Sequence, residues 1–289
     1  MIAHYHYMLL PGLACLVLAG ILAYLGIHVL ERKVIFVDLA LAQISALGFA
    51  FAFLAGFDPH SPEAYNYSLA FATVGAALFA LSRFKKTNQP QEAFIGVIYV
   101  VSAAAAILVV DKSPQGAEHI KELLEGSIVW VTGAEVAKAA GIYAAIGAVH
   151  YLFRKPFFKI TFQPDEAEQS GMWVRAWDFL FYATFGIVVT SAVQIAGVLL
   201  VFTFLIVPSL VSSLFFSRFK VRLVFGWALS AFVGIIGLWL SYDRPSGPMI
   251  ITLMGVALLT AVLAKHWGWK PAALLILVVP LLYKFCFQV

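Results

Sequence analysis

Charged residues are scarce in this chain. Only 12% of its 289 residues are Asp, Glu, Lys or Arg, whereas about a quarter of a typical soluble domain is charged. No charge occurs between Asp178 and Arg218, and hydrophobic residues make up 62% of the sequence. Uncharged runs of about 18 residues or more are typical of transmembrane helices. The scarcity of charge therefore excludes a soluble protein and predicts a polytopic membrane protein.

Cysteines are few, and an N-terminal basic region is lacking. Cys15 and Cys286 lie near opposite ends of the chain, and neither belongs to a CxxC pair or a zinc-ligand spacing, so we expect both to be packing residues. No Lys or Arg precedes Arg32. A cleaved signal peptide begins with a positively charged region, so this absence argues against one.

Catalytic and nucleotide-binding motifs are absent as well. The sequence has no HExxH, no GxSxG and no pair of intramembrane aspartates suited to proteolysis, so we do not expect an enzyme. It has no GxxxxGK[ST] loop, so ATP would have to be bound by another chain. The net charge of +4 comes from loops between apolar runs, which does not indicate nucleic-acid binding.

The apolar runs predict an all-α fold of about 8 to 10 transmembrane helices in a single domain, residues 1–289. The segment 265–289 is the weakest addition, since it contains two prolines and Lys284. The candidate spans are 8–28, 35–57, 65–82, 92–110, 130–153, 178–195, 197–216, 223–241, 248–264 and 271–288.

Basic residues alternate between the two sides of the predicted membrane. Alternate loops carry 14 of the 19 Lys and Arg residues, and cytoplasmic loops are the basic ones. This bias places the N-terminus outside and residues 154–176 in the cytoplasm. The opposite loops are acidic and contain histidines, among them Glu118 and His119, which could attract cations or contact an external binding protein. The alternative is that these are solvated loop residues without a partner.

The uncharged region 179–217 contains two features suited to a transport path. Gln194 is its polar element, and Pro208 removes a backbone hydrogen bond and tends to kink a helix. Both would lie on one face if the helix were continuous, with nearby serines satisfying the freed backbone groups. The alternative interpretation is a structural kink, because prolines are frequent in membrane helices.

Asp38 and Gln43 are the polar residues of the second candidate span. An intramembrane carboxylate is costly without a partner and therefore suggests a functional site. The alternative is that Asp38 caps the start of its helix. A second polar pair, Glu135 and Lys138, is spaced to lie on one helical face and form an ion pair.

Four stretches together resemble the membrane subunits of bacterial metal-ion ABC importers, the zinc, manganese and iron-chelate permease family. They follow one another in the family's order over roughly residues 10–264. The chain differs from the family in the second span. When the family's D-A-L-S-H-A motif is aligned there, its aspartate falls on Leu39 and its histidine falls on Gln43. An amide is a poorer ligand for transition metals than imidazole. The stretches are EAFIGVIYVVSAAAAILV, FQPDEAEQSGMWVRAWD, VQIAGVLLVFTFLIVPSLVSSL and YDRPSGPMIITL.

The resemblance implies a permease subunit of the bacterial cytoplasmic membrane that imports a divalent zinc, manganese or iron ion, or a metal chelate, by alternating access. It implies a second permease copy, a separate ATP-binding subunit and an external metal-binding protein, with no cofactor on this chain itself. The segment 161–178 would couple to the ATPase through a short cytoplasmic helix containing Asp165, Glu166 and Ala167 and ending at Gly171. Two alternatives stay open: a stand-alone secondary cation carrier using Asp38 and the Glu135/Lys138 pair, and a membrane scaffold without transport.

Overall fold

The computed structural model describes residues 2–58, 61–82, 91–111, 126, 128–241 and 244–268, with side chains from residue 8 onward. Within these residues all regular structure is helical, as the composition predicts. The helices are α1 (Ile2–Arg32), α2 (Val37–Leu54), α3 (Pro62–Leu81), α4 (Gln91–Val110), the short 3₁₀ helix η1 (Ile128–Trp130), α6 (Gly133–Leu152), α7 (Arg154–Phe162), α8 (Pro164–Gln169), α9 (Val174–Ala196), α10 (Val198–Phe215), α11 (Phe219–Leu240) and α12 (Ser246–Trp267).

Eight of the described helices are long and apolar enough to cross a membrane, or nine spans if the bent pair α6 and α7 counts as one. The predicted number of 8 to 10 is therefore confirmed, and nine of the candidate spans coincide with helices. The chain bends by 77° between α6 and α7, which the apolar pattern does not predict. The candidate span 271–288 lies outside the described residues.

Local sequence explains where several helices begin. Ser61 caps α3, because its side chain accepts a 3.2 Å hydrogen bond from the Ala64 N–H. Pro62 follows in the first turn, where its missing N–H costs no hydrogen bond. Thr132 and Glu135 form a capping box at the start of α6, in which each side chain accepts a hydrogen bond from the backbone of the other residue. Side-chain oxygens thus satisfy backbone N–H groups that the helices themselves leave unpaired.

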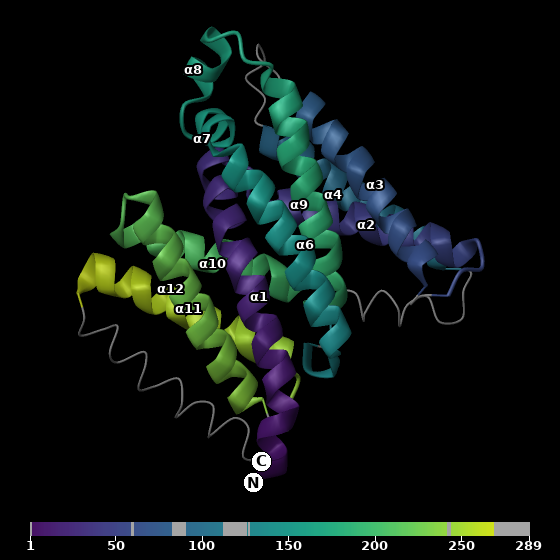
Figure 1. The fold of residues 1–289 in the computed structure, drawn as a ribbon, viewed down its shortest axis with the longest axis vertical. Helices are drawn as coiled ribbons and strands as arrows, with labels where there is room; N and C mark the ends of the chain where they lie inside the picture. Colours follow the sequence, from purple (N-terminus) through teal and green to yellow (C-terminus); the bar gives the residue numbers. More distant parts are fainter. Residues whose placement is uncertain are drawn as a thin grey trace.

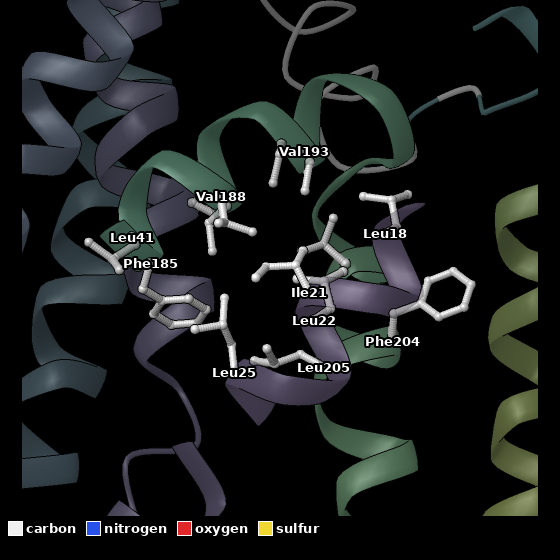
Figure 2. Close-up of a cluster of buried hydrophobic side chains, with 14 of the residues drawn as sticks. Leu18, Ile21, Leu22, Leu25, Leu41, Phe185, Val188, Val193, Phe204 and Leu205 are labelled. Carbon is white, nitrogen blue, oxygen red and sulfur yellow. The ribbon is translucent and has the colours of Figure 1, made fainter. Parts of the chain in front are cut away.

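Helix α1 runs through the middle of the molecule, from the lower end in Figure 1 to the end where α7 and α8 lie. On one side it packs against α10 and α11, and α2, α3 and α4 form a second group that contacts α9. Figure 2 shows where these groups meet, with leucines of α1 among apolar side chains of α2, α9 and α10. The labelled residues are Leu18, Ile21, Leu22, Leu25, Leu41, Phe185, Val188, Val193, Phe204 and Leu205.

Exposed tryptophans mark both ends of the helices. Trp130 and Trp239 lie on the side where α1 begins, and Trp173 and Trp267 lie on the side of α7 and α8. Tryptophan concentrates at the interfaces between membrane and water, so these residues indicate where the bilayer ends. We call the second side the α8 side; its assignment to the cytoplasm stays a prediction from the basic loops.

Candidate transport path and coupling segment

Asp38 is buried in the first turn of α2. Its side chain is 2% exposed, and its Oδ1 atom has no hydrogen-bond partner among the described residues. Phe36, rather than Asp38, occupies the N-cap position, but the Asp38 carboxyl interacts with backbone N–H groups of the first turn, so the capping alternative stays open. The first turn still favours a carboxylate there, because its backbone N–H groups carry partial positive charge.

Glu92 is a second carboxylate at the same end of α2. It belongs to the first turn of α4, and its Oε1 atom accepts a 3.1 Å hydrogen bond from the Phe36 N–H. Its other oxygen, Oε2, is buried without a partner in the described part of the chain. Two carboxyl groups with unpaired oxygens therefore lie at the α8 end of neighbouring helices. The sequence identifies Asp38 by its position inside a span, whereas Glu92 lies at a span edge, where carboxylates are ordinary.

Gln43 lies farther along α2 and is 8% exposed. Helix α2 contacts α3, α4, α9 and α10, so most of its residues are buried within one copy of the chain. Asp38 and Gln43 are five positions apart, which places them on different faces of the helix. The two residues therefore do not form one site by themselves, although the same helix positions both.

Gln194 is the only exposed residue between Leu180 and Val198. It lies in the last turn of α9, whose other residues in this region are buried or half-buried. Exposing an amide to lipid is unfavourable, since nothing there satisfies its hydrogen-bonding groups. The side chain of Gln194 therefore indicates a polar environment at this point, such as a path or a second protein surface.

A break at Gly197 separates Gln194 from Pro208. Gly197 has φ 75° and ψ 160° and ends α9, and α10 starts at the next residue. This backbone conformation is essentially restricted to glycine. Gln194 and Pro208 consequently belong to two helices, and the shared face expected for a continuous helix does not exist.

Pro208 lies inside α10, where three helices pack closely. A Cβ atom on Gly26 of α1 would overlap the Leu205 carbonyl, and one on Gly226 of α11 would lie 3.7 Å from the Pro208 Cβ. The expected rescue of the freed Phe204 carbonyl by serines is wrong. Ser209 Oγ instead donates to the Ala23 carbonyl at 3.4 Å, and Ser212 and Ser213 donate to carbonyls one turn before them in α10. The surroundings of Pro208 are those of a packing residue.

The segment 161–178 contains a short helix, as predicted. Helix α8 starts at Pro164 and ends before Gly171, which has a positive φ of 72°. Asp165 and Glu166 are exposed, whereas Ala167 is fully buried by the chain's own residues. The expectation that Ala167 lets a partner approach closely is therefore wrong, because its methyl group is buried within the chain's own hydrophobic core.

Arg32 of α1 binds side chains at both ends of this segment, Thr161 and Asp178. Its guanidinium donates to the Asp178 carboxylate of α9 and to the Thr161 hydroxyl of α7, both at 3.0 Å. It also lies 3.8 Å from the centre of the Phe181 ring. Arg32 and Asp178 are nearly fully buried. This ion pair therefore ties α1, α7 and α9 together, a role that sequence analysis missed because Arg32 reads as an ordinary loop cation.

Two buried histidines extend this polar network. The Thr161 hydroxyl, which accepts from Arg32, is also hydrogen-bonded to His28 Nδ1 at 2.9 Å. His150 Nδ1 accepts from the Tyr24 O–H at 3.1 Å, and His150 Nε2 lies 2.9 Å from the Thr184 hydroxyl. We call Tyr24, His28, Arg32, His150, Thr161, Asp178 and Thr184 the buried polar network. Histidines within predicted spans are rare and were the available sign of it.

The predicted Glu135/Lys138 ion pair does not form. Glu135 belongs to the capping box of α6, and the Lys138 ammonium lies 4.5 Å from the centre of the Tyr65 ring. Glu118 and His119 lie outside the described residues. Among the residues that are described, no group of three or more His, Cys, Asp or Glu side chains could hold a metal ion.

Known proteins similar to this chain belong to metal-transport systems. The model of the ABC 3 transport family matches residues 4–265. A Haemophilus influenzae protein described as "Probable iron transport system membrane protein" is 25% identical over 261 residues, which is 90% of each chain. The "Manganese transport system membrane protein MntB" of Synechocystis is 25% identical over 221 residues, or 71% of this chain and 72% of that protein.

A solved structure shows the same fold. The structure described as "PsaBC from Streptococcus pneumoniae in complex with Fab" superposes with a TM-score of 0.76 at 19% sequence identity. The superposition covers 95% of this chain and 99% of the matched chain. The arrangement of helices described above is therefore that of a known all-α membrane fold.

Proposed function

We propose, from the premise that the chain belongs to the ABC 3 transport family, that it moves a divalent metal ion or a metal chelate across the cytoplasmic membrane. Family membership makes the chain a multi-pass membrane transport subunit, and it is not itself an enzyme. The cargo proposal rests on the family match over residues 4–265. The relatives described above are named for the transport of iron and manganese, which indicates the kind of cargo.

The proposed assembly supplies what this chain lacks. Two copies would enclose the path, a separate cytoplasmic subunit would bind and hydrolyse ATP, and an external binding protein would deliver the metal. A single copy buries most of α2 and contains no cluster of three metal-ligating side chains within its described residues. A path built between two copies is consistent with both observations.

Asp38, Gln43 and Gln194 are the residues we assign to the path. Asp38 has an unpaired buried oxygen, and Gln194 is the one exposed residue of an otherwise enclosed stretch. Carboxylate and amide oxygens bind hard cations such as manganese better than soft ones. The absence of a histidine at position 43 therefore favours cargo that accepts oxygen ligands, or a chelate whose metal is already coordinated.

Coupling to ATP hydrolysis is assigned to α8 and the buried polar network. The exposed Asp165 and Glu166 would contact the ATPase, and α8 is in contact with α7. Thr161 of α7 is hydrogen-bonded to Arg32, which is paired with Asp178 of α9. A displacement of α8 would thus be passed directly to α1 and α9.

Metal uptake by cells that express the chain with its ATPase and binding protein tests the function. We expect uptake of manganese, iron or zinc that disappears when the ATPase is inactivated by mutation. Uptake that continues with an inactive ATPase would support the stand-alone carrier instead. Gln194→Leu and Asp38→Asn should lower uptake at an unchanged membrane level of the chain, whereas Leu199→Ala, a change at an exposed position just past the break, should not.

A further inference from the structure

A cavity of about 600 Å³ opens between α1, α6, α7 and α11, away from the proposed path residues. Its walls are almost entirely apolar, and they include the exposed side chains of Leu16, Tyr151 and Trp227. Because these residues are exposed, the cavity is open to the surroundings of the helix bundle. At the depth of a membrane those surroundings are lipid acyl chains.

Two cations lie at one end of this cavity. Arg154 is the first residue of α7 and Lys220 is the second residue of α11, and both are exposed on the α8 side. The Arg154 guanidinium lies 4.6 Å from the centre of the Tyr151 ring, which holds it at the cavity wall. Basic residues between membrane helices on one membrane face suit an anionic lipid headgroup.

The length of the cavity fits one leaflet. Its lining on α6 extends from Ala140 to Tyr151, which is about 16 Å at 1.5 Å per residue. The hydrocarbon core of a bilayer is about 30 Å thick, so one leaflet accounts for about half of that. A helix of a second copy would instead need a groove along the whole thickness of the membrane.

The Tyr24 hydroxyl and the His150 ring in the wall are already hydrogen-bonded. Tyr24 donates to His150 Nδ1, and His150 Nε2 bonds to Thr184. The wall therefore offers a ligand no unpaired imidazole nitrogen from His150, and it presents an apolar surface capped by positive charge. We propose that this cavity binds an anionic phospholipid of the leaflet on the α8 side, with an acyl chain in the groove and the phosphate between Arg154 and Lys220.

Native mass spectrometry of the full-length chain, extracted from vesicles of equal phosphatidylglycerol and phosphatidylcholine, tests this proposal. The unmodified chain should retain phosphatidylglycerol in preference. The double variant Arg154→Ala/Lys220→Ala should lower that preference roughly tenfold or more. Each basic residue near an anionic membrane surface contributes about 1 kcal/mol to binding, which for two residues corresponds to a change of at least that size. Lys155→Ala with Arg218→Ala removes the same charge from exposed positions outside the cavity and should leave the preference unchanged.

A second pair of variants tests occupancy of the groove itself. A side chain at Gly147 would enter the cavity without meeting another atom, and one at Gly141 on the same helix also meets nothing but lies outside the cavity. Gly147→Leu should reduce lipid retention, and Gly141→Leu should not. Equal retention by both variants, equal retention by both charge pairs, or no retained phosphatidylglycerol in the unmodified chain would overturn the proposal. So would a disulfide-linked dimer through Leu223→Cys in a chain lacking Cys15 and Cys286, because it would place a second copy over the cavity.

Discussion

At the scale of single residues, buried charge is the chain's most demanding feature. Arg32 and Asp178 lie 3.0 Å apart with almost no exposure, and Arg222 pairs with Glu31 at the same end of α1. A buried ion pair contributes little net stability, because both charges lose their hydration, but removing one partner leaves an uncompensated charge. We infer that Arg32 and Asp178 are kept for the geometry that they impose on α1, α7 and α9.

Asp178→Ala should lower the free energy of unfolding by about 3 to 5 kcal/mol, because it leaves the Arg32 guanidinium buried without its counter-ion. Thermal unfolding of the detergent-solubilised chain would measure the loss. The control is Arg175→Ala, an exposed change one turn earlier in α9, which should alter stability by no more than about 0.5 kcal/mol. Equal stability of the two variants would show that the pair does not hold these helices together.

At the scale of elements, the joint between α9 and α10 depends on one glycine. Gly197 adopts φ 75° and ψ 160°, and a Cβ atom on the neighbouring Gly126 would overlap the backbone at Ala196 and Gly197. Two glycines thus let the backbone at Gly126 lie directly against the break. The break is what turns one long apolar run into two helices.

Gly197→Ala should destabilise the fold by about 1 to 3 kcal/mol, since its backbone conformation is strained for any residue with a Cβ. Gly141→Ala provides the matched comparison. Gly141 lies inside α6, and a Cβ there meets no atom within 4 Å, so this change should be neutral or stabilise the helix by about 0.5 to 1 kcal/mol. A Gly197→Ala variant that unfolds at the same temperature as Gly141→Ala would contradict the requirement for glycine.

Helix α8 has an exposed acidic surface and a buried alanine. Asp165→Lys with Glu166→Lys should abolish association with the ATPase while leaving the stability of the chain unchanged, because both side chains are exposed. Copurification of the ATPase with the variant is the measurement. Ala167→Trp is a different experiment, since Ala167 is fully buried against its own chain and overpacking there should cost about 1 to 3 kcal/mol of stability. Normal association of the double lysine variant would remove α8 from the coupling interface.

Helices could be predicted from the sequence and their contacts could not. Apolar runs and turn residues located nine spans and α8, because local composition decides whether a segment is a membrane helix. The contacts of α7 with α1 and α9, by contrast, follow a 77° bend after α6 that the apolar pattern does not predict. Arg32 and Asp178 are 146 positions apart, and no local pattern pairs residues at that separation. Asp38 could be identified from the sequence, because a lone carboxylate inside an apolar run is a local feature that needs no knowledge of distant contacts.

At the scale of the whole molecule, the two membrane sides differ in charge and in structure. Helices α7 and α8 project on the side opposite the start of α1 (Figure 1), and the basic loops fall on the α8 side. The positive-inside rule assigns that side to the cytoplasm. The same side holds the buried polar network, α8 and the basic end of the cavity between α1, α6, α7 and α11, so a reversed orientation would separate all three from the ATPase that we propose in the cytoplasm.

Single cysteines in a chain without Cys15 and Cys286 would establish the orientation. Thr161 is unsuitable as a labelling site because it is buried in the polar network, whereas Gln169 at the end of α8 and Ala134 at the start of α6 are exposed on opposite sides. An impermeant thiol reagent applied to intact cells should label Ala134→Cys and leave Gln169→Cys unmodified until the membrane is permeabilised. Labelling of Gln169→Cys in intact cells, with Ala134→Cys protected, would reverse the topology, and α8 could then no longer contact an ATPase in the cytoplasm.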